Sequence, residues 1–226
     1  MNETTSQRQT APTGFFGRIG DGLGFIIDVL RARPVARRVL SGFSIVLAVI
    51  GVGMLAYPAY TNFTQSRLQT QLAIEFEKAE TKIAYEAGTL QTGDPLTRIA
   101  IPAIDLKPTL VVEGTTESAL RAGAGHYRNT PLPGEEGNVA IAGHRTTYGK
   151  PFANVDRMKV GDEIKLETPV GTYVYKVSQA PYVVNNNDWT VISQSPGKTL
   201  TLTSCHPKGS SKQRIVIKAE LVPTAA

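Results

Sequence analysis

The feature that most constrains this chain is a run of 19 residues without a charge, VLSGFSIVLAVIGVGMLAY at 39–57. A helix of that length rises about 28 Å, which matches the hydrocarbon core of a bilayer. A cleaved signal peptide is a poorer interpretation, because the run is long and follows a long tail. A buried core helix is the alternative. We predict a transmembrane signal-anchor at 39–58, with its helix ending at Pro58.

Basic residues mark only one side of this run. Four arginines lie just before it: Arg31, Arg33, Arg37 and Arg38. The next basic residue after the run is Arg67. The positive-inside rule therefore predicts a cytoplasmic tail at 1–38 and an extracellular location for 59–226 in a single-pass protein of the cell membrane. Within the tail, the apolar spacing of 14–34 fits an amphipathic helix on the inner leaflet.

Helical spacing resumes after the predicted anchor. Over 61–87 the apolar residues recur near helical intervals: Leu68, Leu72, Phe76 and Ile83. Gly88 can end this helix, and the sequence Gly93-Asp94-Pro95 forms a break. We interpret 59–96 as a stalk, or an N-terminal helix that leans on the domain that follows.

Short β-rich runs bounded by Gly, Pro, Asn and Asp fill the remaining chain. Eight strands are predicted, at 97–104, 109–114, 137–144, 162–169, 171–178, 180–184, 198–205 and 213–221. Short helices are predicted at 115–123, with a threonine cap, and at 151–158. This density of strands predicts an all-β domain at 97–226, an eight-stranded closed β-barrel with short helices.

Charge and ligand content exclude two classes of function. The net charge is +5, and the six arginines and three acids of 1–38 supply +3 of it. The remaining +2, without a basic stripe, does not favour nucleic acid as a partner. One cysteine and three scattered histidines do not provide the ligands of a zinc site, so no metal is expected.

The stretch LTLTSCHPKGSSKQR at 200–214 holds the only cysteine, Cys205. Alternation along the strand places Thr203 and Cys205 on one face. Pro207 has no N–H for a ladder, so the strand should end at the cysteine. A thiol at a strand end, where a loop begins, is a usual place for a nucleophile. An inert buried cysteine is the alternative.

A nucleophilic thiol needs an acid–base partner and a cation. Arg214 opens the next strand, and a hairpin would bring its guanidinium beside Cys205, where it can stabilise an oxyanion; a solvated surface arginine is the alternative. The ring of His206 should point away from Cys205, because neighbouring strand residues face opposite sides. Position ranks His144, at the end of an apolar strand, before His126 in a glycine-rich turn.

Together these residues resemble a known family. GNVAIAGHRTTYGKPF at 137–152, TLTSCHP at 201–207 and Arg214 are similar to the sortases, membrane-anchored cysteine transpeptidases of Gram-positive bacteria with an eight-stranded barrel. The similarity runs from about Ile99 to Leu221. Ser204 stands where the family usually has threonine. The resemblance is greatest to class E, the housekeeping type of high-GC actinobacteria.

The resemblance implies roles for individual residues. His144 matches the catalytic histidine, Cys205 the nucleophile and Arg214 the catalytic arginine, while Arg145 competes for the arginine role. His126 matches a position without a catalytic role. Four residues are expected to contact an extended peptide, with core packing as the alternative for the aromatic ones: Tyr148, Tyr182, Trp189 and Thr203.

The resemblance also implies a reaction. A sorting signal of the LAxTG or LPxTG kind, near the C-terminus of an exported protein, would be cleaved between Thr and Gly. The acyl group would pass to an amine of lipid II or peptidoglycan, without metal or organic cofactor. The alternatives are a membrane-anchored cysteine protease that hydrolyses its substrate, a pilin-polymerising sortase and a non-catalytic anchored binding module.

Overall fold

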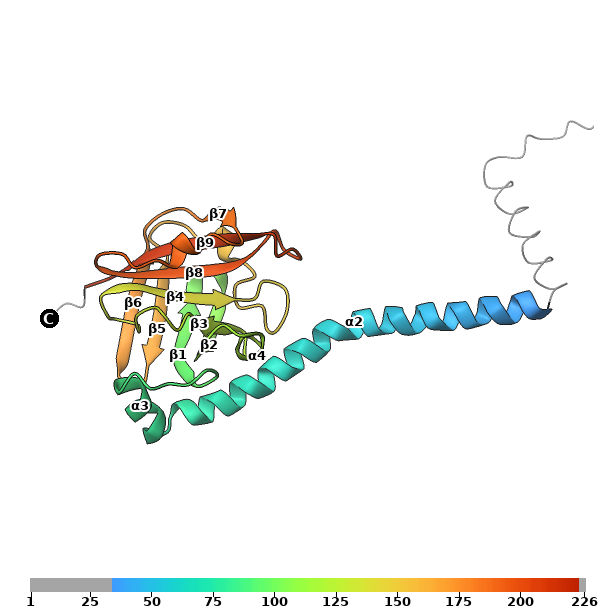
Figure 1. The fold of residues 1–226 in the computed structure, drawn as a ribbon, viewed down its shortest axis with the longest axis horizontal. Coiled ribbons are helices and arrows are strands. Elements are labelled where there is room, and N and C mark those ends of the chain that lie inside the picture. Colours follow the sequence, from blue (N-terminus) through green and yellow to red (C-terminus); the bar gives the residue numbers. More distant parts are fainter. Residues whose placement is uncertain (1–33, 224–226) are drawn as a thin grey trace, which may run out of the picture. The chain divides into compact units, whose positions relative to one another are not determined.

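The computed structural model describes residues 34–223, and its course is drawn in Figure 1. The chain divides into two units, residues 1–55 and 56–226, and each is described by itself. The amphipathic helix predicted at 14–34 lies outside the described residues except for Pro34.

Helix α2 spans Pro34–Phe76 and contains Pro58. The prediction that the helix ends at Pro58 is therefore wrong. A proline removes one N–H donor, and a helix tolerates that loss where the following residues are good helix formers with a surface to dock on. The hydroxyl of Thr61 donates to the carbonyl of Pro58 at 3.1 Å.

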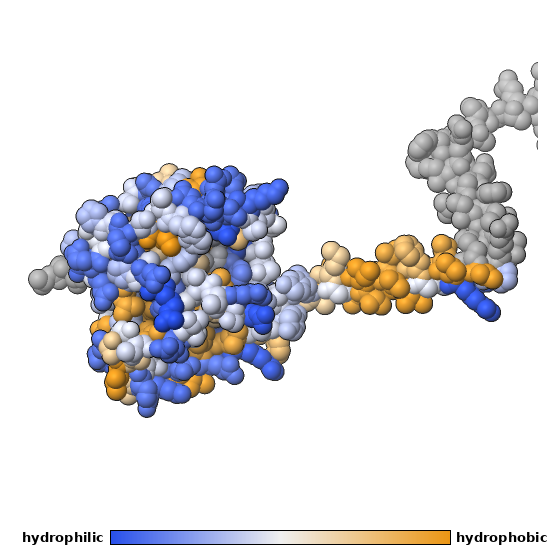
Figure 2. Space-filling view, viewed as in Figure 1, coloured by the Kyte–Doolittle hydropathy of each residue, from blue (hydrophilic) through white to orange (hydrophobic). Residues whose placement is uncertain are grey.

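The first part of α2 is apolar and exposed. Its side chains between Val39 and Leu55 form the hydrophobic part of the helix in Figure 2. Among residues 34–223, α2 is the one helix long and apolar enough to cross a membrane. The division of the chain into a tail, an anchor, a stalk and a catalytic domain stays a prediction.

The last part of α2 belongs to the second unit and packs within it. Leu72 and Phe76 form an apolar cluster with residues of strand β2, at Leu106–Glu113, and the segment after it: Leu110, Val112, Ala119 and Ala122. A short helix, α3 at Ala79–Glu86, follows after a break at 77–78. The helix predicted at 61–87 is thus two helices, of which the first continues from the apolar segment.

Nine strands form one sheet: β1 Pro95–Ile101, β2 Leu106–Glu113, β3 Ala124–His126, β4 Gly137–Gly143, β5 Glu163–Thr168, β6 Gly171–Val177, β7 Tyr182–Asn185, β8 Lys198–His206 and β9 Gln213–Leu221. The order is β6-β5-β1-β2-β3-β4-β8-β9-β7, and β6 also pairs with β9. Eight strands therefore close a ring, and β7 lies outside it along the first half of β9. The predicted eight-stranded barrel is confirmed, although the ring includes β3, which was not predicted, in place of β7.

Short helices fill the connections. Helix α4 spans Glu117–Leu120, and the side chain of Thr116 accepts a hydrogen bond from the Ala119 N–H, so the predicted threonine cap is confirmed. Residues 34–223 contain three 3₁₀ turns: η1 Pro102–Ile104, η2 Val155–Arg157 and η3 Trp189–Ile192. The helix predicted at 151–158 is reduced to η2.

The centre of the barrel is a single apolar core, to which Leu200 and Leu202 of β8 contribute fully buried side chains. β8 lies between β4 and β9. Its pairing with β4 is parallel, with Gly143 opposite Ser204, and its pairing with β9 is antiparallel. Parallel strands end at the same edge of a sheet, so the residues that follow β4 meet those at the end of β8.

Candidate active site

The thiol of Cys205 lies beside the guanidinium of Arg214. The two residues are opposite each other in the β8–β9 ladder, and Arg214 Nη1 is 3.5 Å from Cys205 Sγ. The same nitrogen donates to the carbonyls of Ser211 and Gln213 at 3.1 and 3.2 Å. The loop of the hairpin thus orients the guanidinium before any substrate arrives. β8 extends one residue past the predicted end, to His206, which pairs with Gln213.

His144 follows β4 directly and is half-buried. Its N–H donates to the carbonyl of Gly123 at 3.2 Å, and its carbonyl accepts from the Phe152 N–H at 3.1 Å. The ring of Tyr148 lies 5.4 Å from the imidazole, centroid to centroid, at 38°. Burial lowers the pKa of His144 below its ordinary value of 6.5, because the cation loses hydration.

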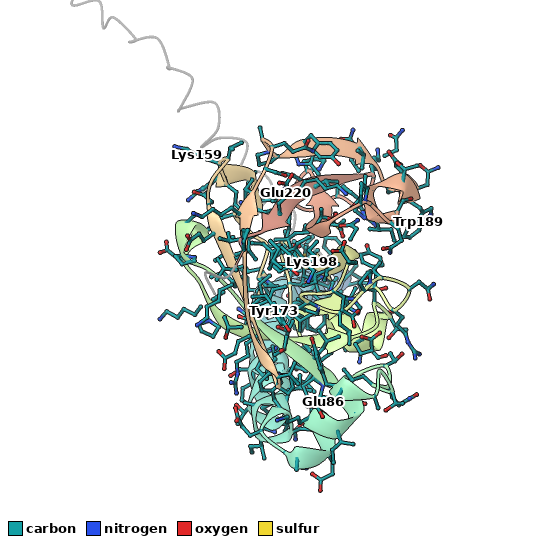
Figure 3. All side chains as sticks on the ribbon, turned by 90° about the vertical axis from the view of Figure 1, so that its left-hand side faces the viewer. Glu86, Lys159, Tyr173, Trp189, Lys198 and Glu220 are labelled. Carbon is teal, nitrogen blue, oxygen red and sulfur yellow. The ribbon has the colours of Figure 1, made fainter. Side chains whose placement is uncertain are left out.

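A cavity of about 200 Å³ unites the three residues. His144, Cys205 and Arg214 line it together with a further set: Thr115, Leu120, Tyr127, Ala142, Gly143, Trp189, Thr203 and Ser204. Trp189 is 63% exposed and lies at the outer edge of the molecule in Figure 3, so it forms part of the cavity mouth. A neighbouring hollow of about 440 Å³ shares Thr115, Tyr127 and Trp189 with this cavity.

Two hydroxyls of β8 hold neighbouring elements at the cavity. The Ser204 hydroxyl donates to the carbonyl of Gly143 at 2.6 Å and so joins the strand ends that carry Cys205 and His144. Thr203 Oγ1 lies 3.1 Å from the hydroxyl of Tyr127. Tyr127, like Thr115 and Leu120, was not predicted as part of the site, because these places depend on the pairing of β3 with β4 and on the packing of α4 against β2 and β3.

The remaining predicted peptide-binding residues lie elsewhere. Tyr148 packs against the ring of His144 but is not among the residues that line the cavity. Tyr182, in β7, is half-buried and does not line it either. Burial, with the nearby Asp188 carboxylate, raises the pKa of Tyr182. Thr203 and Trp189 are the two of the four that border the cavity.

The other two histidines have partners of their own. His126 is 1% exposed, and its Nδ1 lies 2.9 Å from Glu113 Oε2 while its Nε2 lies 3.0 Å from the Pro131 carbonyl. His206 Nδ1 lies 3.2 Å from Arg145 Nη1. Neither histidine lines the cavity of Cys205.

Arg145 contacts the backbone of Cys205 and not its thiol. Its side chain is buried and forms an ion pair with Asp156 at 2.7 Å. Its Nη1 donates to the backbone carbonyl of Cys205 at 3.4 Å, as well as contacting His206. Arg145 therefore ties the end of β8 to η2. Asp156 was not predicted as a partner of Arg145, because it lay within a predicted helix.

Within residues 34–223, no three His, Cys, Asp or Glu side chains gather in a group that could hold a metal ion. The chemistry available at the cavity is that of a thiol, an imidazole and a guanidinium. This set can attack a carbonyl, stabilise the resulting oxyanion and protonate a leaving amine. Fold and cavity together define a closed β-barrel protein in which a cysteine, a histidine and an arginine line one cavity.

The chain belongs to the sortase family, because the family model described as "Sortase domain" matches residues 99–222. Sortase SrtE1 of Streptomyces coelicolor is 27% identical over 212 residues, which cover 85% of this chain and 60% of the relative. The chain thus spans about 60% of the length of that relative. This family membership confirms the resemblance read from the motifs.

Solved structures agree with this assignment. A Clostridium perfringens Sortase D5 transpeptidase has a TM-score of 0.61 and 31% identity, and the match covers 71% of this chain and 99% of that one. Sortase E1 from Streptomyces coelicolor, solved with a tripeptide in the active site, has a TM-score of 0.54 and 28% identity, over 59% of this chain and 91% of that one. The similarity therefore extends over nearly all of each solved chain.

Proposed function

We propose that this chain is a membrane-anchored cysteine transpeptidase in which Cys205, His144 and Arg214 perform the chemistry. One observation carries the proposal: the Arg214 guanidinium lies 3.5 Å from the Cys205 thiol, in a cavity that His144 also lines. Three chemically complementary groups from separate strands share one small cavity, which is the arrangement that acyl transfer through a thioester requires.

In the first step, the Cys205 thiolate attacks the carbonyl carbon of a Thr–Gly peptide bond. The C–S bond forms, and the negative charge moves to the carbonyl oxygen, where Arg214 donates a hydrogen bond. The C–N bond then breaks, and the His144 imidazolium gives its proton to the leaving glycine amine. The products are a thioester on Cys205, a free amine and a neutral His144.

In the second step, an amine attacks the thioester. Neutral His144 accepts the proton of the incoming nitrogen while the C–N bond forms, and the C–S bond breaks to return the Cys205 thiolate. The enzyme thus regains its starting protonation state. The acceptor we propose is an amine of lipid II or peptidoglycan, which is a membrane-associated or wall-associated partner.

The peptide substrate we propose is a sorting signal of the LAxTG kind, with LPxTG as the related sequence. The apolar and aromatic lining next to the thiol supports an extended peptide, because Leu120, Tyr127 and Trp189 offer contact area beside hydrogen-bonding groups such as Thr203. The relative solved with a tripeptide in its active site supports a peptide at this place.

The location we propose follows from α2. An anchor at 39–58 would hold the barrel at the membrane where exported substrates and the acceptor both arrive, which raises their effective concentration. The arginines before the anchor support a cytoplasmic N-terminus and an extracellular barrel. Protease treatment of intact cells tests this orientation, and a barrel that resists external protease would contradict it.

The reaction is tested with the full chain in detergent micelles and a fluorescent LAxTG peptide, with and without an amine acceptor. We expect a covalent peptide adduct on Cys205 by intact mass, and an acceptor-dependent ligation product. The Cys205→Ala variant should form neither. Hydrolysis that ignores the acceptor would favour the protease alternative, and cleavage by Cys205→Ala would exclude the mechanism.

A further inference from the structure

One face of α2 completes the hydrogen bonding of the barrel next to His144. The carboxamide of Gln69 accepts from the Leu110 N–H at 2.8 Å and donates to the Leu110 carbonyl at 2.9 Å. It also donates to the Ala122 carbonyl at 2.8 Å. The β2–β3 ladder begins at Val111, so the carboxamide takes the place of a strand where β3 has not yet started.

The turn that Gln69 holds is the turn that holds His144. Ala122 and Gly123 are buried, and the carbonyl of Gly123 accepts the hydrogen bond from the His144 N–H. Adjacent peptide groups therefore bind α2 on one side and His144 on the other. A shift of this turn would move the backbone of His144 with it.

Gln65 lies one helical turn earlier and contacts both loops around His144. Its Nε2 donates to the Ala122 carbonyl at 3.3 Å. A Cβ added to Gly149 would lie 2.7 Å from Gln65 Cδ, and one added to Gly123 would lie 3.6 Å from Gln65 Nε2. The side chain is thus wedged between the turn at 122–123 and the loop that follows His144.

That loop carries the ring that packs on the imidazole. Tyr148, Gly149 and Lys150 have φ angles of 47°, 70° and 41°, so three consecutive residues are left-handed. This conformation is sterically unfavourable for the two non-glycine residues, Tyr148 and Lys150, so contacts from outside the loop must stabilise it. Asn62 of α2 provides one such contact, since its Oδ1 accepts from the Gly149 N–H at 3.3 Å.

We propose that Gln65 and Gln69 of α2 are positioning residues for His144, because they hold the turn that binds its backbone and the loop that packs on its ring. The inference rests on the catalytic role proposed above for His144. Both glutamines lie in the part of α2 that belongs to the second unit, together with the barrel and His144.

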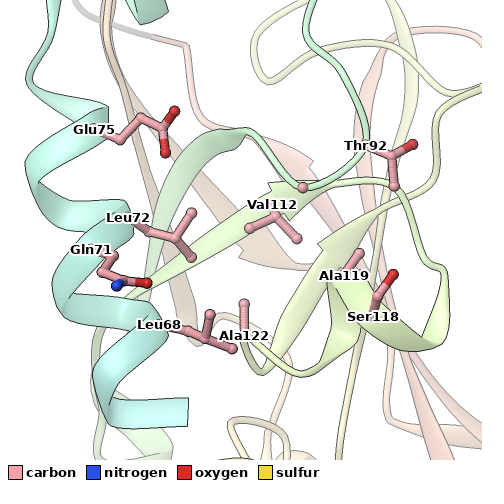
Figure 4. A pocket seen from close by; sticks show the side chains of 10 residues that line it. Leu68, Gln71, Leu72, Glu75, Thr92, Val112, Ser118, Ala119 and Ala122 are labelled. Atoms are coloured by element: carbon pink, nitrogen blue, oxygen red, sulfur yellow. The ribbon is translucent and has the colours of Figure 1, made fainter. Parts of the chain in front are cut away.

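The helix offers a matched control. Gln71 is exposed, and its side chain makes no hydrogen bond within residues 34–223. Figure 4 shows it with Leu68 and Leu72 on the α2 side of a separate hollow of about 360 Å³, opposite Val112 and Ala122. Gln71→Ala removes the same side chain as Gln65→Ala without touching the supports of His144.

The test uses the full chain in detergent micelles, with variants Gln65→Ala, Gln65→Met, Gln69→Ala and Gln71→Ala. Peptide cleavage gives kcat and KM, and the thermal midpoint reports folding. Labelling the histidine Cε1 carbons gives three NMR signals, of which those of His126 and His206 are internal references for His144.

We expect Gln65→Ala and Gln69→Ala to lower kcat about tenfold with little change in KM, since sub-ångström displacement of a catalytic group has effects of this size. The His144 signal and its titration midpoint should move, while the His126 and His206 signals stay. Gln65→Met keeps the bulk of the wedge and should recover most of the activity. Gln71→Ala should behave as wild type.

The inference is wrong if folded Gln65→Ala and Gln69→Ala keep kcat within about twofold of wild type and leave the His144 signal in place. It is also wrong if all three histidine signals move together with the thermal midpoint, because that reports general loosening. A wild-type chain that cleaves no sorting peptide would refute the proposed function, and the His144 signal would still decide this inference.

Discussion

Removing the Arg214 guanidinium should slow the reaction without weakening the barrel. Its Nη1 is 3.5 Å from Cys205 Sγ and is fixed by the carbonyls of Ser211 and Gln213. A donor held in this way stabilises an oxyanion without reorganising, and the loss of one such donor costs about 10²–10³ in kcat, or about 3–4 kcal/mol. We expect a loss of that size for Arg214→Ala, and a smaller loss for Arg214→Lys, which keeps the charge but not the fork.

Arg145 should show the opposite separation of rate and stability. Its side chain is 2% exposed and pairs at 2.7 Å with Asp156, whose side chain is 42% exposed. A charge-assisted hydrogen bond contributes about 1.5–3 kcal/mol, and solvent around Asp156 screens the pair toward the lower end. Arg145→Met should therefore lose about 2 kcal/mol of stability, a fall of about 4–8 °C in Tm for a unit of this size.

The assay compares the full-chain variants in one detergent. Cleavage of the fluorescent LAxTG peptide gives kcat, and circular dichroism gives Tm. Tryptophan fluorescence is a poor probe of unfolding here, since the single tryptophan, Trp189, is already 63% exposed in the folded state. Lys212→Ala is the matched control, because Lys212 is an exposed cation in the same hairpin as Arg214.

The roles given to Arg214 and Arg145 are wrong if the Arg214 variant keeps its activity or the Arg145 variant loses activity while it stays folded. An Arg214→Ala variant that keeps kcat within about threefold of wild type would exclude the oxyanion role. An Arg145→Met variant that stays folded at the assay temperature but loses about 100-fold in kcat would transfer that role to Arg145. An equal loss in Lys212→Ala would mean that local positive charge, and not the placed guanidinium, is what matters.

Three further outcomes are expected. His144→Ala should lose about 10³-fold in peptide cleavage, and His206→Ala less than about tenfold, because only His144 shares the cavity of Cys205; comparable losses would reverse the assignment. Burial lowers the pKa of His144, so the titration midpoint of its Cε1 NMR signal should lie below pH 6.5, and a midpoint above pH 7 would contradict this. Gly143→Ala should lower Tm and kcat together, because the new Cβ would lie 2.5 Å from the buried Phe152 ring. Overpacking of this kind costs about 1–3 kcal/mol of stability, and an unchanged Tm would show that the ring moves aside without this cost.

Local rules predicted most of the fold. Alternation and glycine or proline boundaries predicted eight of the nine strands. β3 was not predicted, because a three-residue strand within AGAGHY has no alternation to detect, and its pairing with β2 and β4 defines it. The end of the helix at Pro58 was predicted wrongly for a related reason. Contacts of Gln69 and Leu72 with the barrel stabilise a helix that local propensity alone would interrupt.

The candidate site was likewise predictable only in part. The pair of Cys205 and Arg214 was predictable, since Cys205 ends one strand, Arg214 opens the next, and a hairpin brings these two strand ends together. Position in the sequence ranked His144 first, but its place beside Cys205 depends on a parallel β4–β8 pairing that alternation does not reveal. The link from Arg145 to Asp156 was not predictable, because it joins two connections whose backbones are irregular.

The parallel pairing of β4 and β8 explains why activity and stability should separate in this barrel. Both strands end at the same edge. His144 follows the last residue of β4, and Cys205 lies one residue past the last β4–β8 pair, where only the β8–β9 ladder still holds it, opposite Arg214. Core residues such as Leu202 stabilise the strands, but the core cluster does not include Cys205 or His144. The positions of the reacting groups must then come from contacts outside the core. For Cys205 these are Arg145 and Arg214, and for His144 they are the turn and loop held by α2. Substitutions of Gln65 and Gln69 should therefore change the rate more than they change the stability, while substitutions of core residues such as Leu202 should do the reverse.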